Sequence, residues 1–390
     1  MIVLFEFFGP EPIENVITSM HYSIEKVVYF GFDDSIENRS KSAVRFLHQR
    51  CGVKTVEIEK LKKNDLPAIL DVMRDKIKSE IAKGNEVYFD ITGGEYLILV
   101  AFGILSRELD TPMHLFDVVS NSIIEIDEGS SRSMSLNVPK NDIRFDLDSY
   151  IELKGGVINY KLDKALKEDE SEETAGEIAK IWNVSNRYPE TWTLFSDFMK
   201  AHLSPDSELR VRKSAREISD ALYENGKVFN TPKKLNAILD ELAFAGLLLD
   251  LVHAEGRYSF AFKNRNIKDC IWDGGSILEL HVFEEERKQS DDCLVGVHLD
   301  WDGVIHPERG KDVLNEIDVL TLNGNIPTFI SCKTGKMDAN KTLHAFYELS
   351  TVSKRFGGKY SKRVLVCTQN VSDIYLERAN EMDIEVRIIK

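Results

Sequence analysis

The first 119 residues alternate between short apolar runs and amphipathic stretches, and this alternation restricts the fold more than any other feature of the chain. Apolar runs of strand length occur at 2–7, 26–30, 55–58, 86–90 and 113–119. Stretches with helical character separate them, at about 13–23, 39–50, 68–83 and 95–108. Strands that alternate with helices form a parallel sheet that is covered on both faces. We therefore expect a doubly wound α/β domain at the N-terminus.

Two glycine-containing segments follow strands of this predicted sheet. Phe8-Gly9-Pro10 comes after the first strand, and Thr92-Gly93-Gly94-Glu95 follows the fourth strand and leads into a helix. Ligands of doubly wound sheets bind beyond the carboxyl ends of strands. Glycine lets the backbone approach a ligand there, and a helix N-terminus offers free N–H groups to an anion. The two segments predict an anion-binding cleft, and a tight turn without a ligand is the other interpretation of Gly93-Gly94.

A β-hairpin is predicted around Asn323-Gly324, a dipeptide that is typical of two-residue hairpin loops. Such a loop would pair Leu322 with Asn325 and place Asp318 and Lys333 on the same side of the sheet. Both charged residues lie in otherwise apolar strands, where an ion needs a partner or a function. A carboxylate and a lysine that converge on one side of a hairpin suit metal-dependent hydrolysis. Charges on a solvated face are the alternative interpretation.

The hairpin resembles the core of PD-(D/E)xK nucleases. Asp318 occupies the position of the single acid, and Ser331-Cys332-Lys333 occupies the (D/E)xK position, with a serine in place of the acid. The predicted pairing puts Glu316 opposite Ser331, which makes Glu316 the nearest substitute for the missing carboxylate. The family takes a further acid from a preceding helix, and Glu279 fits that position. Ser276 and Glu279 also form the pattern of a capping box, so helix capping is a second interpretation of this glutamate.

This resemblance implies a metal-dependent nuclease. Glu279, Asp318 and the carbonyl of Cys332 would hold Mg²⁺ or Mn²⁺, hard cations that prefer oxygen ligands. Lys333 would orient the attacking water or neutralise the scissile phosphate. We assign catalytic roles to Asp318, Lys333, Glu279, Glu316 and Ser331 on this basis.

The N-terminal segment resembles the CRISPR-associated Rossmann fold (CARF) sensor domain, in which a strand–Thr-Gly-Gly–helix turn contacts a cyclic oligoadenylate. The resemblance implies that Thr92-Gly93-Gly94 contacts the ligand, with Gly9 and Pro10 as the other wall of the cleft. Glu95 replaces the small polar residue expected at its position. The family also implies cyclic tetra-adenylate as the activator, and a homodimer, because a two-fold symmetric ring needs two copies of the pocket.

The segment between these two regions is expected to be helical. A helix over about 231–244, followed by a hairpin that ends at Phe262, resembles a winged helix, which we interpret as a rigid spacer. The predicted organisation is a CARF sensor domain at 1–145, a linker and helical or winged-helix-like segment at 146–262, and a PD-(D/E)xK nuclease domain at 263–390.

Composition narrows the possible environment and partners. The five cysteines form no CxxC pair, which argues for a reducing cytoplasm and against zinc or disulfides. No apolar stretch approaches the length of a membrane span. The net charge of −15 argues against a nucleic-acid partner, but the stretch 331–365 is basic. Its cations predict a phosphate-binding patch beside the metal site: Lys333, Lys336, Lys341, Lys354, Arg355, Lys359, Lys362 and Arg363.

The combined resemblances indicate a nuclease of type III CRISPR antiviral defence, activated by cyclic oligoadenylate and acting on DNA or RNA. Two alternatives remain. One is an ungated nuclease of the restriction or repair type. The other is a CARF-controlled regulator that binds nucleic acid through the winged-helix-like segment and carries an inactive nuclease fold; the serine at position 331 keeps this alternative open.

Overall fold

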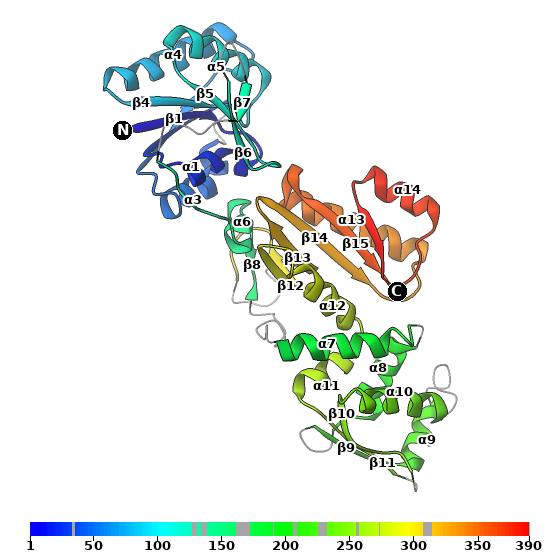
Figure 1. The fold of residues 1–390 in the computed structure, drawn as a ribbon. Coiled ribbons are helices and arrows are strands. Elements are labelled where there is room, and N and C mark those ends of the chain that lie inside the picture. Colours follow the sequence, from blue (N-terminus) through cyan, green and yellow to red (C-terminus); the bar gives the residue numbers. More distant parts are fainter. Residues whose placement is uncertain are drawn as a thin grey trace.

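The structure is a computed structural model in which three sheets, each with its own helices, follow one another along an elongated molecule (Figure 1). The seven-stranded N-terminal sheet lies at one end, a small three-stranded sheet lies at the other, and a six-stranded sheet lies between them. The structure describes residues 1–32, 36–126, 131–133, 139–160, 172–189, 191–205, 209–224, 232–254, 257–272, 274–306 and 314–389. Within these ranges, no helix is long and apolar enough to cross a membrane.

The N-terminal sheet has the strand order β3-β2-β1-β4-β5-β6-β7. Its first five strands run parallel, and β6 and β7 extend it as antiparallel strands. The strands are β1 (Ile2–Phe7), β2 (Lys26–Gly31), β3 (Thr55–Lys60), β4 (Glu86–Asp90), β5 (Met113–Asp117), β6 (Ser122–Ile126) and β7 (Ser131–Ser133). The order reverses between β1 and β4, which is where ligands of doubly wound sheets bind.

Helices cover both faces of this sheet (Figure 1). They are η1 (Pro12–Asn15), α1 (Ile17–His21), α2 (Ile36–Arg39), α3 (Lys41–Gln49), α4 (Leu66–Ala82) and α5 (Tyr96–Leu109). Alternate residues of β1 serve the two faces: Phe5 packs with residues of α4 and α5, and Leu4 packs with the core on the α1 and α3 side. Both faces are therefore apolar, as expected for a central parallel strand.

The helix predicted over 13–23 divides into η1 and α1, and the buried side chain of Asn15 accounts for the break. Its Nδ2 donates to the carbonyl of Phe7 at 2.8 Å, and its Oδ1 accepts from the amide of Gly9 at 3.2 Å. Asn15 thus satisfies backbone groups of the loop after β1, and Val16 leaves helical geometry with φ of −129°. The hydrogen bonds of Asn15 to the loop that carries Gly9 therefore replace a continuous helix over 13–23.

A buried ion cluster joins β2 to α4. Lys26 Nζ lies 3.1 Å from Glu80 Oε1, and Lys83 and Asn85 also donate to the Glu80 carboxylate. Burial raises the pKa of Glu80, but the hydrogen bonds from Lys83, Lys26 and Asn85 outweigh it and lower the pKa to about 2. The folded state therefore prefers ionised Glu80 more strongly than the unfolded chain does.

This cluster makes stability depend on pH in a defined way. A lowered folded-state pKa contributes stability that is present above the ordinary value of 4.5 and lost as the pH falls toward about 2. We expect Glu80→Gln to reduce the free energy of unfolding by about 1–3 kcal/mol at pH 7. Urea titrations from pH 7 down to pH 3 should show wild type and variant converging as the pH falls. A difference independent of pH would contradict the proposed ionic origin.

The three-stranded sheet has the order β10-β11-β9 and supports the winged-helix-like unit. Helix α10 leads into the β10–β11 hairpin, as predicted, and β9 adds a third strand that the sequence did not predict. The elements of this region are α7 (Glu172–Ser185), α8 (Trp192–His202), β9 (Arg210–Ser214), α9 (Ala215–Glu224), α10 (Pro232–Phe244), β10 (Leu248–Val252), β11 (Arg257–Phe262) and α11 (Arg265–Trp272).

The six-stranded sheet has the order β16-β15-β14-β13-β12-β8. Its strands are β8 (Val157–Ile158), β12 (Asp292–Asp300), β13 (Leu314–Asn323), β14 (Ile326–Lys333), β15 (Lys362–Cys367) and β16 (Glu385–Ile388). The associated helices are α6 (Leu147–Leu153), α12 (Ser276–Glu286), α13 (Ala339–Phe356), η4 (Gly358–Tyr360) and α14 (Asp373–Glu381). Strand β8 precedes the winged-helix-like unit in sequence, yet it pairs with β12 and so belongs to this later sheet.

Alternation along the central strands buries both faces of this sheet. Val319 and Ile330 pack in the same core as residues of α12, whereas Leu320 and Phe329 pack in the core that contains α13. The core on the α13 side continues through Tyr150 of α6 into the N-terminal domain. The sensor-like and nuclease-like sheets are therefore joined by packed apolar side chains as well as by the chain itself.

The hairpin between β13 and β14 has a different register from the predicted one. Asn323 pairs with Ile326, which shifts every pair by two residues from the expected pairing of Leu322 with Asn325. The two loop residues are Gly324 and Asn325. Gly324 has φ of 58°, a left-handed conformation that glycine adopts without strain and that favours this residue in the loop. A shift of two residues keeps every side chain on its predicted face.

Candidate functional site

Asp318 lies where the hairpin strands separate. The β13–β14 pairs end at Val319 and Ile330, whereas β13 continues to pair with β12 and β14 with β15 beyond this point. Asp318 Oδ2 accepts hydrogen bonds from Ser331 Oγ at 3.1 Å and from the amide of Cys332 at 2.5 Å. The Asp318 side chain thus accepts hydrogen bonds from β14 where the backbone pairing of β13 with β14 has ended. We call this point, where the two strands separate, the fork. Its Oδ1 accepts no hydrogen bond from the residues that the structure describes.

Lys333 completes this group. Its Nζ lies 3.4 Å from Asp318 Oδ2, and the two side chains retain 27% and 14% of their exposure. Burial lowers the pKa of Lys333, but the charge of Asp318 and the hydrogen bond to it outweigh burial and raise the pKa overall. Lys333 is therefore a partly exposed cation at neutral pH and suits the binding of a phosphate rather than proton abstraction.

Glu279 approaches the same place from α12. Burial raises the pKa of the Cys332 thiol, and the negative charges of Asp318 and Glu279 raise it further. Both carboxylates therefore lie within electrostatic reach of Cys332. Helix α12 begins at Ser276 with Gly275 as its N-cap, so Ser276 occupies the first helical position rather than the N-cap that a capping box requires.

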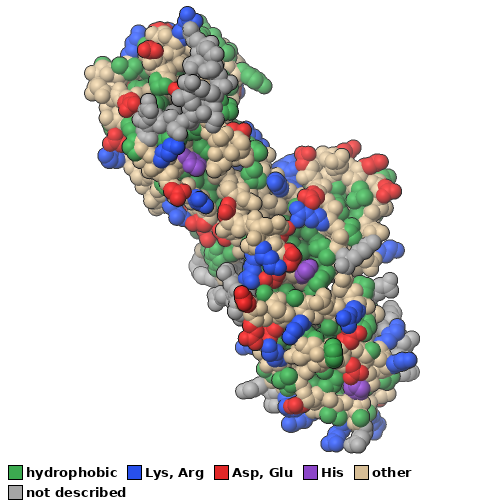
Figure 2. All heavy atoms as spheres, in the orientation of Figure 1, with side chains coloured by type: hydrophobic (Ala, Val, Ile, Leu, Met, Phe, Trp, Pro, Cys, Tyr) green, Lys and Arg blue, Asp and Glu red, His purple; other side chains and the backbone are tan. Residues whose placement is uncertain are grey.

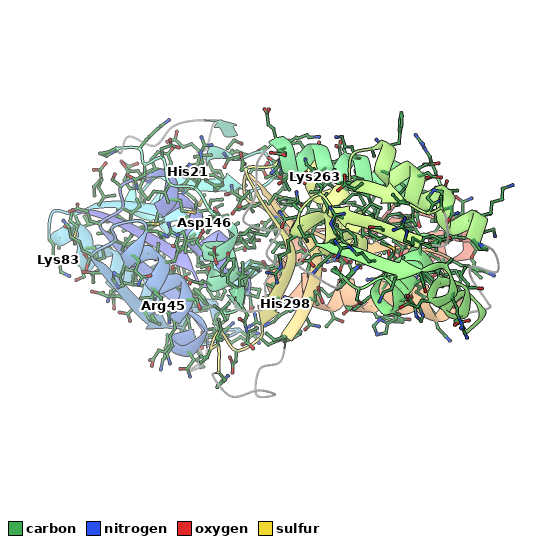
Figure 3. The ribbon with its side chains drawn as sticks, turned by 90° about the horizontal axis from the view of Figure 1, so that it is seen from below. His21, Arg45, Lys83, Asp146, Lys263 and His298 are labelled. Carbon is green, nitrogen blue, oxygen red and sulfur yellow. The ribbon has the colours of Figure 1, made fainter. Side chains whose placement is uncertain are left out.

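Glu316 does not lie opposite Ser331, and that prediction is wrong. The shifted register brings Asp318 to that position, and Glu316 pairs across the sheet with His298 of β12. His298 Nε2 lies 3.8 Å from Glu316 Oε2, and the glutamate side chain is 48% exposed. His298 is labelled in Figure 3, on the strands between the N-terminal domain and the winged-helix-like unit. Ser331 therefore has no opposing glutamate and donates to Asp318 instead.

The oxygen donors at this fork suit a hard cation. Asp318, Glu279 and the Cys332 carbonyl supply two carboxylates and one main-chain oxygen, and Asp318 Oδ1 is left open. Among the residues that the structure describes, no group of three or more His, Cys, Asp or Glu side chains could hold a metal. The remaining ligands of an ion here would be main-chain oxygen and water.

The basic residues of 331–365 do not form one patch, which corrects the sequence-based expectation. Lys333 pairs with Cys367 at one end of β15, whereas Lys362 begins that strand at its other end. Lys341 remains near the fork, where its Nζ donates to the Thr334 carbonyl at 2.6 Å. On the face shown in Figure 2, Lys and Arg are interspersed with Asp and Glu. Phosphate contacts at the fork would rest on the few cations that are near Lys333.

A second site lies at the switch point of the N-terminal sheet. Strands β1 and β4 are parallel neighbours, so the segments after them, with Gly9-Pro10 and Thr92–Glu95, lie at the same edge. The Thr92 amide donates to Asp90 Oδ1 at 2.7 Å, and Thr92 Oγ1 accepts from the amide of Phe116 at 2.8 Å. These bonds tie the turn to β4 and β5. The Thr92 side chain therefore shapes the turn.

The two glycines of this turn are required by close contacts. A Cβ on Gly93 would lie 2.6 Å from Glu14 Oε2, and a Cβ on Gly94 would lie 2.9 Å from Leu99 Cδ2. Gly94 also has φ of 150°, which side-chain-bearing residues rarely adopt. Glu95 is the N-cap of α5, makes no capping hydrogen bond, and lies 3.6 Å from Lys63 Nζ. The N–H groups of the first turn of α5 therefore receive no side-chain cap from Glu95.

Two residues of this region, Glu14 and Tyr360, were not predicted from the sequence, and their contacts involve Lys359. Glu14 is 4% exposed, accepts a hydrogen bond from Tyr360 Oη at 2.7 Å, and lies 2.5 Å from Lys359 Nζ. Lys359 and Tyr360 belong to η4, after the nuclease-like helix α13. A contact between residues that are 346 positions apart produces no local sequence pattern that could predict it. The sequence indicated only that Lys359 is one of the cations of 331–365.

A doubly wound sheet joined to a second sheet in which an aspartate lies beside Ser-Cys-Lys defines the class: an α/β protein with a PD-(D/E)xK-like nuclease core. Comparison with known families agrees. Residues 270–389 match the family model described as Card1-like, endonuclease domain. The matched residues lie within the segment 263–390 that was predicted to be the nuclease domain, and they support the prediction of an endonuclease. No curated protein sequence matches the chain significantly.

Solved structures share the fold over nearly the whole chain. Protein VC1899 from Vibrio cholerae aligns with a TM-score of 0.71 and 16% identity, covering 99% of this chain and 93% of that one. Can2 from Sulfobacillus thermosulfidooxidans, solved with cyclic tetra-adenylate, aligns with a TM-score of 0.63 and 15% identity, covering 98% and 92%. A type III CRISPR defence DNA nuclease activated by cyclic oligoadenylate aligns at 0.52 and 13% identity, covering 94% and 45%. These likenesses confirm the predicted fold class.

Proposed function

We propose that the protein is a metal-dependent nuclease of type III CRISPR defence that cleaves DNA when cyclic tetra-adenylate binds its N-terminal domain. The observation that carries this proposal is the convergence of Ser331, Cys332 and Lys333 on one carboxylate oxygen of Asp318. The convergence lies inside the segment that matches a Card1-like endonuclease domain. RNA is a second substrate that the same chemistry would hydrolyse.

Asp318, Glu279 and the Cys332 carbonyl would hold the Mg²⁺ or Mn²⁺ ion. When bound, the ion would lower the pKa of a coordinated water and stabilise charge on the phosphate. Ser331 and the Cys332 amide hold Asp318 by Oδ2, which would leave Oδ1 for the ion. Ser331 thus acts through Asp318, as a positioning residue in place of the family's second acid.

Lys333 would bind the scissile phosphate or orient the attacking water. Its ammonium is held charged by Asp318 and stays partly exposed, so a phosphate can approach it. A lysine contacts a phosphate as a point charge, which tolerates a range of substrate orientations.

The cleft at the switch point would bind the activator. Gly9 and Pro10 would form one wall, and Thr92, Gly93, Gly94 and Glu95 the other. The N–H groups at the start of α5 would face a phosphate of the ring. Can2, which shares the fold, was solved with cyclic tetra-adenylate, and this supports the choice of ligand.

A homodimer follows from a symmetric ring ligand and is supported by α5. Tyr96, Val100 and Ile104 are 89%, 49% and 42% exposed, and their spacing of four residues places them on one face of the helix. This apolar stripe begins directly after the ligand turn. A second copy of the chain would cover it and bring a second turn to the same ring.

Cleavage of labelled DNA and RNA, single- and double-stranded, tests the proposal directly. We expect DNA cutting that requires both Mn²⁺ or Mg²⁺ and cyclic tetra-adenylate, and that stops when EDTA removes the ion. Ion-dependent cleavage at the same rate with and without cyclic tetra-adenylate would contradict the sensor role of the N-terminal domain. Tight DNA binding without cutting under any condition would contradict the nuclease and favour a nucleic-acid-binding regulator.

A further inference from the structure

The nuclease domain reaches the proposed ligand cleft through η4, the short turn after α13. Lys359 donates its backbone amide to Glu11 Oε1 at 3.3 Å, and its side chain and that of Tyr360 contact Glu14. Glu11 and Glu14 belong to the segment that follows β1 and Gly9. A part of the nuclease domain therefore lies at the edge of the sheet where the activator would bind.

Glu14 connects this turn to the glycines of the cleft. Its Oε2 lies 2.6 Å from the position of a Cβ on Gly93 and 3.8 Å from that of a Cβ on Gly9. Its Oε1 accepts from Tyr360 and lies 2.5 Å from Lys359 Nζ. One buried carboxylate thus contacts the ligand turn with one oxygen and the nuclease domain with the other.

Lys359 differs from its partner in exposure. Its side chain is 56% exposed, whereas Glu14 is 4% exposed. The ammonium can therefore be reached from solvent beside the cleft while the carboxylate cannot. A ring of phosphodiesters placed against Gly93 would bring negative charge next to Glu14, which already holds the exposed ammonium of Lys359.

We infer that Lys359 is a phosphate-binding residue of the sensor cleft, supplied by the nuclease domain and held by Glu14 until the ligand arrives. This inference rests on the proposed function. Ligand phosphate and Glu14 compete for the same ammonium, so binding weakens the contact between Glu14 and η4. Because η4 directly follows α13, which packs on β14 and β15, the competition links the cleft to the nuclease sheet.

A second contact keeps η4 in place during this exchange. Lys154 Nζ lies 2.6 Å from Glu11 Oε2, and both side chains are largely buried. Gly358 has φ of 67°, and a Cβ there would lie 2.2 Å from Glu11 Oε2. The backbone of η4 therefore packs closely against the side chains of the Glu11–Lys154 ion pair. Movement of the Lys359 side chain would not separate the domains.

Binding of cyclic tetra-adenylate to the full-length protein tests the inference. We expect Lys359→Ala to weaken binding by about tenfold or more, because a hydrogen bond to a charged group is lost. The affinity of this variant should also depend less on salt than that of wild type, a change that a merely structural role would not produce. Glu14→Gln keeps the size of the side chain but removes the competing charge, and should tighten binding severalfold. Lys180→Ala, an exposed lysine of α7, serves as the control and should bind as wild type does.

Three results would overturn the inference. Wild-type affinity and salt dependence in Lys359→Ala would show that the ammonium does not touch the ligand. Weakened binding in Glu14→Gln, to the same degree as in Lys359→Ala, would show that the contact only supports the fold. Failure of wild type to bind cyclic tetra-adenylate would contradict the proposed function, and this inference with it. If wild type binds the nucleotide and is activated by it, and Lys359→Ala binds equally well, only the role of Lys359 is contradicted and the proposed function stands.

Discussion

Asp318→Asn is expected to reduce DNA cleavage at least about a thousandfold, because a metal ligand contributes several kcal/mol to the transition state. Asparagine has one oxygen where aspartate has two. The Ser331 hydroxyl and the Cys332 amide would take that oxygen, and the amide NH₂ would face the ion. The variant keeps a hydrogen-bonding group at the fork, so it should fold. Single-turnover cleavage at saturating Mn²⁺ and activator measures the loss.

A matched variant separates the loss of a ligand from the loss of a charge. Glu285→Gln removes an exposed carboxylate from α12 that pairs only with Lys288 among the described residues, and its cleavage should stay within about twofold of wild type. Both variants should bind cyclic tetra-adenylate normally, since the fork lies outside the cleft. Cleavage by Asp318→Asn within tenfold of wild type would contradict the assignment of Asp318 as a metal ligand.

Gly93→Ala is expected to raise the concentration of cyclic tetra-adenylate needed for half-maximal activation by about fivefold or more. The new methyl group would meet Glu14 at 2.6 Å, and Glu14 is buried and bonded to Tyr360 and Lys359. Relieving such a contact costs about 1–3 kcal/mol, which is about a 5- to 150-fold effect on a binding equilibrium. Activation curves over a range of nucleotide concentrations provide the measurement.

Gly176→Ala controls for the substitution itself. Gly176 lies in α7 with open space where its Cβ would be, so alanine there should leave activation unchanged and raise helix stability by about 0.5–1 kcal/mol. Cleavage by Gly93→Ala at saturating nucleotide should approach the wild-type rate, because the fork is intact. An unchanged activation curve for Gly93→Ala would place the ligand away from this turn.

Local sequence patterns predicted the parallel strands of the N-terminal sheet well, because these strands are apolar runs, but they did not predict β12, β15 and β16 of the six-stranded sheet. β1, β2 and β4 appear where the runs of 2–7, 26–30 and 86–90 indicate. Local patterns did not predict the break in the first helix. This break arises because the Asn15 side chain hydrogen-bonds to the loop after β1. β8 and β9 escaped prediction, since strands of two and five residues with few apolar positions carry little signal.

The nuclease fork shows why a partly wrong register still located the site. The Asn-Gly rule placed the hairpin loop one residue too early, and the pairing moved by two residues. Because side chains alternate with a period of two, Asp318 and Lys333 stayed on the same face. Glu316 was misplaced by the same shift. The contact of Glu14 with Lys359 and Tyr360 depends on packing between distant segments, which periodicity does not reveal.

The position of β8 has a consequence for how the chain can be divided. Two residues near 157 complete the edge of a sheet whose other strands begin more than 130 residues later, at Asp292. A fragment beginning at residue 263 would lack this strand, and backbone donors and acceptors of β12 at Leu299 and Asp300 would lose their partners. Such an effector fragment would present an open sheet edge to other copies. The chain therefore cannot be cut cleanly between the N-terminal domain and the nuclease-like sheet.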